Sequence, residues 1–320
     1  MKICIIGPGI LTIPPTGWGA VEILIDDYRK NLEKLGHEVF IVNTKIPQHI
    51  VGITNALNPD FVHIQYDDFA YIIPHIECKN VAITSHYGYV EQPDRWESHY
   101  RKIFWDFVNS NAKLFCLSPG IAEIYRKANV PEDRIFVTPN GVRTDLFRYT
   151  ENPKYPERSI YLAKIDYRKR QHIYQNIPDL YFAGGCHDNR FDTSNPRYLG
   201  HWSKSVLYDS LTNYANLVLL SDGEAHPLVC MEALSAGLGL VISEYASANL
   251  DTSLPFIDVV SESKIHDLDY VRGVLENNRK VSVKMRKEIR EYAMNFDWER
   301  VVKEKYVKSV EKILEGNNEQ

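Results

Sequence analysis

The chain has 320 residues, of which 44% are hydrophobic and 25% are charged, and its formal net charge is −5. This length exceeds a typical single domain and suits two domains that each bury their own core. The charge balance lacks the basic surplus of nucleic-acid-binding proteins, so we expect no nucleic-acid partner. The five cysteines are scattered without CxxC spacing, which favours reduced thiols over a disulfide framework or a zinc site.

The N-terminal segment, residues 2–6, is a short apolar run without a signal-peptide cleavage site, and it is expected to form a strand. No apolar run in the sequence approaches the roughly 20 residues needed to span a bilayer. We therefore expect a cytoplasmic protein. Residues 96–107 combine aromatic and basic side chains. This composition is compatible with peripheral contact to a membrane surface, and a buried amphipathic helix is the alternative interpretation.

The first half of the chain alternates between strand-like and helix-like segments. Strands are expected at residues 2–6, 38–42, 61–64, 80–84, 113–117 and 134–137, with helices at 21–35, near 96–109 and at 119–128. This alternation indicates a doubly wound parallel sheet. Gly7 and Gly9 begin a dinucleotide-binding pattern, but Thr12 stands where its third glycine belongs, so an NAD site is disfavoured.

The second half repeats the pattern after a polar stretch with two prolines, residues 151–158, which predicts an interdomain linker. Strands are expected at 159–163, 180–185, 217–220 and 238–243, a helix at 203–213, and mostly helix from 264 onward. We therefore expect an α/β fold with a first domain at 1–150, a second at 151–295 and a closing helical segment at 296–320.

Two carboxylates flank a predicted helix start within residues 221–237. Glu224 falls in a loop, Pro227 suits the first helical position, and Glu232 lies about 7 Å further along the helix axis. The free N–H groups of a first helical turn carry partial positive charge and suit a phosphate. A ligand that is anionic in the middle and rich in hydroxyls at both ends, such as a nucleotide sugar, fits this arrangement. Two solvated surface carboxylates are the alternative.

Glu224, seven intervening residues and Glu232 resemble the E-x7-E signature of retaining glycosyltransferases with the GT-B fold, family 4 in the sequence classification. Other segments resemble the same family in the same order, at residues 14–22, 36–39, 84–88, 139–142, 163–169, 198–201 and 297–314. The resemblance implies two Rossmann-like domains that face each other across a cleft. It also implies a C-terminal helix that crosses back to the N-terminal domain.

The resemblance also implies roles for individual residues. It assigns Glu224, His86 and Lys169 to catalysis, with Glu224 at sugar hydroxyls near the reacting centre and His86 positioning the sugar. Donor-binding roles extend to Gly19, Lys164, Lys169, Gly200, Glu224, His226, Pro227, Leu228, Val229 and Glu232, with the two lysines at the diphosphate and Glu232 at the ribose. The chain departs from the family pattern at Trp18, Ala20, Ala163 and Lys164.

The implied activity is metal-independent transfer of a hexose-class sugar, with retention, as in polysaccharide biosynthesis. The donor would be a UDP- or GDP-linked sugar held by the second domain, and no other cofactor is expected. The acceptor would be a hydroxyl of a glycan or of a lipid-linked glycan, held by the first domain. Two alternatives stay open: a nucleotide-sugar epimerase or phosphorylase on the same fold, and a non-catalytic nucleotide-sugar-binding subunit of a glycan-assembly complex.

Overall fold

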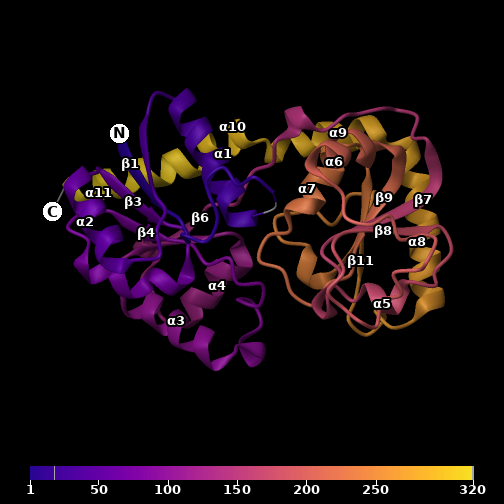
Figure 1. Cartoon of the computed structure of the whole chain (residues 1–320), viewed down its shortest axis with the longest axis horizontal. Coiled ribbons are helices and arrows are strands. Elements are labelled where there is room, and N and C mark those ends of the chain that lie inside the picture. The colour runs from indigo at the N-terminus through magenta and orange to yellow at the C-terminus, as the bar shows by residue number, and fades with distance from the viewer. Residues whose placement is uncertain (18, 319–320) are drawn as a thin grey trace. The chain divides into compact units, whose positions relative to one another are not determined.

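The computed structural model describes residues 1–17 and 19–318, and in it the chain forms two compact units, each built on its own parallel sheet (Figure 1). The first unit joins Met1–Gly141 to the segment that begins at Trp298, and the second is Val142–Asp297. The division falls after Gly141 and not after residue 150, and the strand Tyr155–Leu162 already occupies half of the predicted linker, residues 151–158. Trp18 lies outside the described residues.

The sheet of the first unit has the strand order β2-β1-β3-β4-β5-β6, and all its neighbouring strands are parallel. The strands are β1 (Lys2–Ile6), β2 (Glu38–Val42), β3 (Phe61–Ile64), β4 (Val81–Ile83), β5 (Lys113–Cys116) and β6 (Ile135–Val137). The helices are α1 (Ala20–Lys34), α2 (Pro47–Leu57), α3 (Ser98–Asn109) and α4 (Pro119–Lys127). Every residue of β3 and β4 is buried, as expected of strands covered on both faces.

The C-terminal segment packs on the first unit, as expected from the sequence (Figure 1). It consists of α10 (Trp298–Val301), a π-helical stretch (Val302–Val307) and α11 (Lys308–Asn318). The Trp298 ring lies edge-on to Tyr28, with 4.8 Å between ring centroids. A Cβ atom on Gly141 would lie 2.8 Å from the Cα atom of Trp298, so only glycine allows this approach. The closing helix is thereby fixed to the sheet with which the chain begins.

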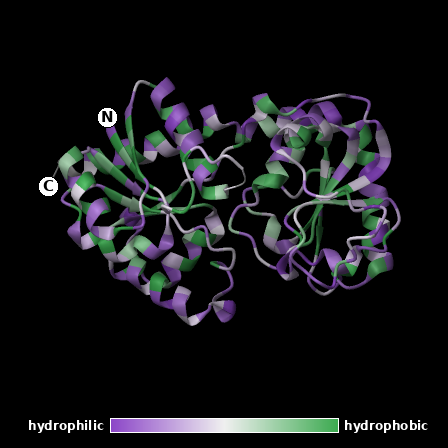
Figure 2. Ribbon diagram, viewed as in Figure 1, coloured by the Kyte–Doolittle hydropathy of each residue, from purple (hydrophilic) through white to green (hydrophobic). Residues whose placement is uncertain are grey.

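The second unit has the strand order β11-β10-β9-β7-β8, again with all neighbouring strands parallel. Its strands are β7 (Tyr155–Leu162), β8 (Leu180–Ala183), β9 (Tyr214–Leu219), β10 (Gly239–Ser243) and β11 (Ile257–Val260). Its helices are α5 (Gln171–Tyr174), α6 (Lys204–Ser210), α7 (Leu228–Ser235), α8 (Leu268–Lys284) and α9 (Arg286–Ala293). Figure 2 shows apolar strands in both sheets and helices with polar outer faces.

Helix α3 is amphipathic. Ile103, Phe104 and Phe107 are buried, whereas Arg101 and Trp105 are exposed. The helix therefore contributes one face to the core of the first unit. Within the described residues, no helix combines the length and the apolar composition needed to cross a membrane.

Each sheet reverses its strand order once, between β1 and β3 in the first unit and between β7 and β9 in the second. In open α/β sheets, ligands bind at such reversals, outside the carboxyl ends of the strands. The loop after β7 contains Lys164 and Lys169, and the loop after β9 contains Glu224. The topology of the second unit therefore brings these predicted site residues to one edge of the sheet.

At Gly184, the segment that follows β8 packs closely against the segment that follows β7. The φ of Gly184 is +150°, and a Cβ atom there would lie 1.9 Å from the carbonyl oxygen of Ala163. Because this obstacle is backbone, Gly184→Ala is expected to lower the free energy of unfolding by about 3 kcal/mol in chemical denaturation. Gly273→Ala is the control, since Gly273 lies in α8 with nothing within 4 Å of an added Cβ. Equal stability of both variants would contradict the expectation.

Candidate functional site

A tight turn after β7 directs Lys169 inward. The carboxylate of Asp166 accepts a hydrogen bond from the Lys169 backbone N–H at 3.0 Å and so caps this turn. The Tyr161 hydroxyl donates to the Lys169 carbonyl oxygen and accepts from the backbone N–H of Leu220 at 2.8 Å. One buried tyrosine thereby joins the loops that follow β7 and β9. Lys169 is 9% exposed as a result.

The ammonium group of Lys169 forms an ion pair with the carboxylate of Glu224. Arg168 lies on the other side of that carboxylate, with Nη1 3.4 Å from Glu224 Oε2, and also donates to the Gly223 carbonyl. Burial raises the pKa of Glu224, but the two cations outweigh burial and hold the pKa below its usual value. Glu224 is therefore ionised at neutral pH, and the structure brings two of the predicted catalytic residues into contact.

Arg170 also holds the loop after β7 in place. Its backbone is left-handed, with φ of 58°, and its guanidinium donates two hydrogen bonds to Glu262 at 3.0 and 2.9 Å. Asp222 Oδ2 lies 3.9 Å from the same guanidinium. Sequence reasoning gave no role to Arg168, Arg170 or Glu262. The signal available was the run of basic residues directly after a strand at the reversal.

Lys164 differs from Lys169 in its surroundings. Its side chain is exposed, and among the described residues no carboxylate lies within ion-pair distance of it. Its carbonyl oxygen accepts a hydrogen bond from the Gln171 side chain at 3.0 Å, which fixes the backbone at this point. Lys164 therefore offers a positive charge that no internal carboxylate neutralises.

Helix α7 begins one residue later than its sequence predicts. Pro227 is the N-cap, with an extended ψ of 99°, and Leu228 and Val229 are the first helical residues. The N–H groups of these two residues precede the first intrahelical hydrogen bond and so suit an anion. His226 is buried just before the helix, and Glu232 is half-buried in it. Helix α7 begins four residues after Glu224, at the same edge of the sheet.

The remaining predicted donor residues occupy glycine turns. Gly200 has a φ of +73°, and its carbonyl accepts the Gly184 N–H at 2.9 Å beside the carboxyl end of β8. Gly19 belongs to the first unit and is the N-cap of α1. A Cβ atom on Gly19 would lie 2.8 Å from Leu11 Cδ1 and 2.9 Å from Glu22 Oε2, both of which are ends of flexible side chains. Ala20 lies inside α1, where φ is negative and its methyl group is tolerated.

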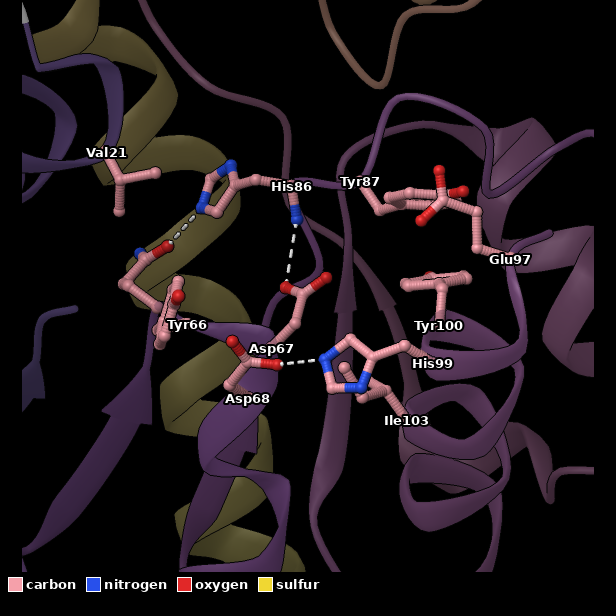
Figure 3. Close-up of a pocket in the computed structure, with 11 residues that line it drawn as sticks. Val21, Tyr66, Asp67, Asp68, His86, Tyr87, Glu97, His99, Tyr100 and Ile103 are labelled. Atoms are coloured by element: carbon pink, nitrogen blue, oxygen red, sulfur yellow. Dashed lines mark hydrogen bonds and ion pairs between the residues drawn. The ribbon is translucent and has the colours of Figure 1, made fainter. Parts of the chain in front are cut away.

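His86 lies in a second site, a cavity of about 290 Å³ in the first unit beyond the carboxyl ends of β3 and β4 (Figure 3). His86 Nε2 is 2.8 Å from Gln65 Oε1, and Gln65 donates through Nε2 to His63 Nδ1 at 3.2 Å. Because the amide oxygen only accepts, His86 carries its proton on Nε2. Burial lowers the pKa of His86 to about 4 and that of His63 to about 3. Both rings are therefore neutral at physiological pH.

Asp67 and Asp68 begin a 3-10 helix (Asp67–His75) and also line this cavity (Figure 3). The Asp67 carboxylate accepts from the Ser85 hydroxyl at 2.8 Å and from the His86 backbone N–H at 3.3 Å. Burial raises its pKa to about 6. Asp68 pairs with His99 at 2.8 Å. Sequence reasoning missed the cavity, although the position of the two carboxylates directly after a strand at the reversal was a usable signal.

The neutral His86 predicts a pH dependence of stability. Its pKa is about 4 in the folded protein and about 6.5 in the unfolded chain, so the unfolded state binds more protons between these values. Stability is therefore lost as the pH falls from 6.5 to 4. Urea denaturation gives the free energy of unfolding of the native protein and of His86→Gln at each pH. The difference between the two proteins should fall by about 3 kcal/mol between pH 6.5 and pH 4. A difference that is independent of pH would contradict the neutral ring.

Comparison with known proteins agrees with this architecture. Residues 45–146 match the sequence model of Glycosyltransferase Family 4. A search of the curated proteins finds no match.

Three of the solved structures that resemble the chain match it over nearly the full length of both proteins. Sucrose-phosphate synthase from Thermosynechococcus elongatus is 15% identical, with a TM-score of 0.74 and coverage of 95% of this chain and 96% of that one. Anabaena HepE in complex with UDP-glucose is 12% identical, with a TM-score of 0.70 and full coverage of both chains. The lipopolysaccharide outer core galactosyltransferase WaaB is 17% identical, with a TM-score of 0.70 and coverage of 99% and 100%. The chain therefore has the GT-B fold of glycosyltransferases, and residues 45–146 carry the sequence pattern of glycosyltransferase family 4.

Proposed function

We propose that the protein is a retaining, metal-independent glycosyltransferase that moves a hexose-class sugar from a nucleotide-sugar donor to an acceptor hydroxyl. The observation that carries this proposal is the cluster after β7 and β9. There the Lys169–Glu224 ion pair and the exposed Lys164 lie at the strand-order reversal, beside the start of α7. A diphosphate needs positive charge, and the sugar attached to it needs hydrogen-bond acceptors; this edge offers both.

The chemical barrier in such a transfer is separation of a sugar cation from a nucleoside diphosphate. Lys164, Lys169 and the N–H groups of Leu228 and Val229 would stabilise the phosphate charge as it develops, without a metal. Glu224, ionised and buried, would accept hydrogen bonds from sugar hydroxyls near the reacting carbon. The departing phosphate would take the acceptor proton on the same face, which gives retention.

The ion pair has a further consequence for binding. Lys169 and Glu224 neutralise each other, so an incoming diphosphate competes with the carboxylate for the ammonium group. Arg168 stays within 3.4 Å of Glu224 and would keep that carboxylate ionised while Lys169 contacts the phosphate. This sharing of one carboxylate between two cations would avoid an uncompensated buried charge during donor binding.

We propose a UDP- or GDP-linked donor, with no cofactor beyond this substrate, and an acceptor that is a glycan or a lipid-linked glycan. The fold similarity to HepE, a protein solved with UDP-glucose, makes UDP-glucose the first donor to test. The neutral His86 would position a sugar through its unprotonated Nδ1 and is not proposed as a general base. We propose a cytoplasmic location, in keeping with a nucleotide-sugar substrate.

A thermal-shift screen against UDP- and GDP-sugars tests the proposal. A donor at about 100 times its Kd stabilises the folded state by about 2.7 kcal/mol, which such a screen detects. Product analysis follows with the donor that binds. Release of nucleoside diphosphate that depends on an acceptor supports transfer, whereas donor conversion without acceptor or a requirement for inorganic phosphate indicates an epimerase or a phosphorylase. Binding without turnover under any acceptor indicates a non-catalytic subunit, and no binding at all contradicts the proposal.

Glu232→Ala is expected to raise the donor KM about tenfold with little change in kcat, because a ribose contact contributes equally to ground-state and transition-state binding. The comparison is steady-state kinetics at saturating acceptor. Glu276→Ala, an exposed carboxylate on α8 that pairs with Arg272 at 3.6 Å, is the control and should leave both constants unchanged. A fall in kcat with unchanged KM would place Glu232 at the reacting centre and not at the ribose.

A further inference from the structure

We infer that the cavity beyond β3 and β4 binds an acceptor sugar that is neutral or carries an amino group, with the amino sugar preferred, and excludes sugars that carry phosphate or carboxylate. This inference rests on the proposed function and specifies its acceptor. It follows from the charge, the aromatic wall and the rigidity of a cavity that lies wholly within the first unit (Figure 3).

The charged groups around the cavity are predominantly acidic. Asp67, Asp68 and Glu97 line it, and none of its described lining residues is a lysine or an arginine. His86 is neutral, and the ring of His99 is held by Asp68 at 2.8 Å. A phosphate or carboxylate on a ligand would therefore meet like charges, and no lysine or arginine of the described lining could compensate them. An ammonium group would instead form charge-assisted hydrogen bonds to the carboxylates.

Two tyrosines form an aromatic wall on one side of the cavity, with Glu97 beside them (Figure 3). The rings of Tyr87 and Tyr100 are stacked, with centroids 3.8 Å apart and an angle of 19° between the planes. Figure 3 shows this pair on the side of the cavity opposite His86. The stacking covers one face of each ring and Tyr100 is only 4% exposed, so the pair offers a ligand a limited apolar surface for the C–H groups of a sugar, while carboxylates accept hydrogen bonds from its hydroxyl groups. The volume of about 290 Å³ lies at the lower end for small-molecule sites and suits one sugar ring.

The aromatic wall is held in place from outside the cavity. The segment that carries Tyr87 is bound through the Trp96 indole, which donates to the Tyr89 carbonyl at 2.9 Å. Glu91 of the same segment accepts from the Ser118 hydroxyl at 2.7 Å, at the N-terminus of α4. A Cβ atom on Gly120 would lie 2.2 Å from this carboxylate, so glycine permits the contact. The cavity is therefore preformed, which reduces the entropic cost of binding a small ligand.

Saturation-transfer NMR titration of the full chain at pH 7.0, without any donor, tests the inference. The ligands are glucosamine, methyl glucoside, glucuronate and glucose 6-phosphate. Glucosamine is expected to bind at least about fivefold more tightly than methyl glucoside, because its ammonium forms charge-assisted bonds. Neither anionic sugar should show saturation transfer. Tighter binding of either anion, or no binding of any sugar, would overturn the inference.

The double variant Asp67→Asn, Asp68→Asn tests whether these two carboxylates cause the preference for glucosamine over methyl glucoside. It should lose the preference for glucosamine but keep the binding of methyl glucoside, since amides also accept hydrogen bonds. Asp106→Asn is the matched control, because Asp106 pairs with Lys102 on the exposed side of α3. An unchanged preference in the double variant would overturn the inference.

A parallel thermal shift with UDP and GDP, on the same samples, reports on nucleotide binding independently of the sugar titration. Loss of nucleotide binding would count against the proposed function, whereas failure of the sugar titration with nucleotide binding intact would count against this inference only.

Discussion

Lys169→Ala is expected to lower kcat by about a hundredfold, the scale of losing one contact that strengthens in the transition state. Lys169 is buried, and its position is fixed by the Asp166 cap and by the Tyr161 hydroxyl, so no neighbouring cation can take its place without rearrangement. Arg170 is bound to Glu262, and Arg168 to Glu224. Steady-state kinetics with the identified donor and acceptor measure the effect.

Two variants separate chemistry from stability. Lys169→Ala removes a partner of a buried carboxylate and should also destabilise the fold, so the double variant Lys169→Met, Glu224→Gln is needed. It should recover stability, because neither a buried carboxylate nor a buried ammonium group is left unpaired, but it should not recover kcat. Lys102→Ala, which breaks an exposed pair on α3, is the control for loss of a lysine. Recovery of kcat in the double variant, or a hundredfold loss in the control, would contradict the assignment.

Arg286→Ala is expected to lower the free energy of unfolding by about 4 kcal/mol, the largest stability effect that we predict. Arg286 is 2% exposed and begins α9. Its guanidinium donates to the carbonyl oxygens of Thr150, Thr212, Tyr214 and Ala236, at 2.7, 2.7, 3.0 and 3.0 Å. Truncation would leave these buried acceptors without a donor and open a cavity where several segments of the second unit meet.

Burial lowers the pKa of Arg286 to about 10, which still leaves the group charged at neutral pH. The charged guanidinium of Arg286 is therefore stabilised by its hydrogen bonds to neutral carbonyl groups. Arg272→Ala is the matched control, because Arg272 makes an exposed pair with Glu276 and should change stability by less than about 0.5 kcal/mol. Chemical denaturation compares the two variants with the native chain. Similar stability of Arg286→Ala and Arg272→Ala would contradict the structural role of Arg286.

The two-unit fold was predictable because buried parallel strands have a simple sequence pattern. Runs such as residues 3–6 and 217–220 are continuously apolar, and each is followed by glycine or small polar residues at the sheet edge. The boundary between units was not predictable from composition. Prolines at 153 and 156 resembled a linker, yet Tyr155–Leu162 pairs with β9 across a register shift, which accommodates the irregular start of the strand.

The sequence was sufficient to assign Lys169 and Glu224 to one site, but it did not identify the residues around that pair. Glu224 and Lys169 follow the two strands at the reversal, so topology alone places them close together. Arg170 finds its partner in Glu262, 92 residues away, and short-range patterns contain no such information. Pro227 shows the limit of a positional preference, since it caps α7 and does not begin it.

The cavity of the first unit was missed for a related reason. Asp67 and Asp68 have the pattern of a helix start, and they do begin one. Their second role depends on Ser85, Tyr87 and Tyr100, which reach the same place from β4 and α3. Only the fold brings these groups together.

The most direct test of the donor site is a crystal structure of the chain with bound UDP or GDP, whichever gives the larger thermal shift. We expect phosphate oxygens within hydrogen-bond distance of Lys169 Nζ and of the backbone N–H groups of Leu228 and Val229. We also expect Glu224 to remain beside Arg168. A nucleotide bound elsewhere, with the Lys169–Glu224 pair undisturbed and the loops after β7 and β9 untouched, would contradict it.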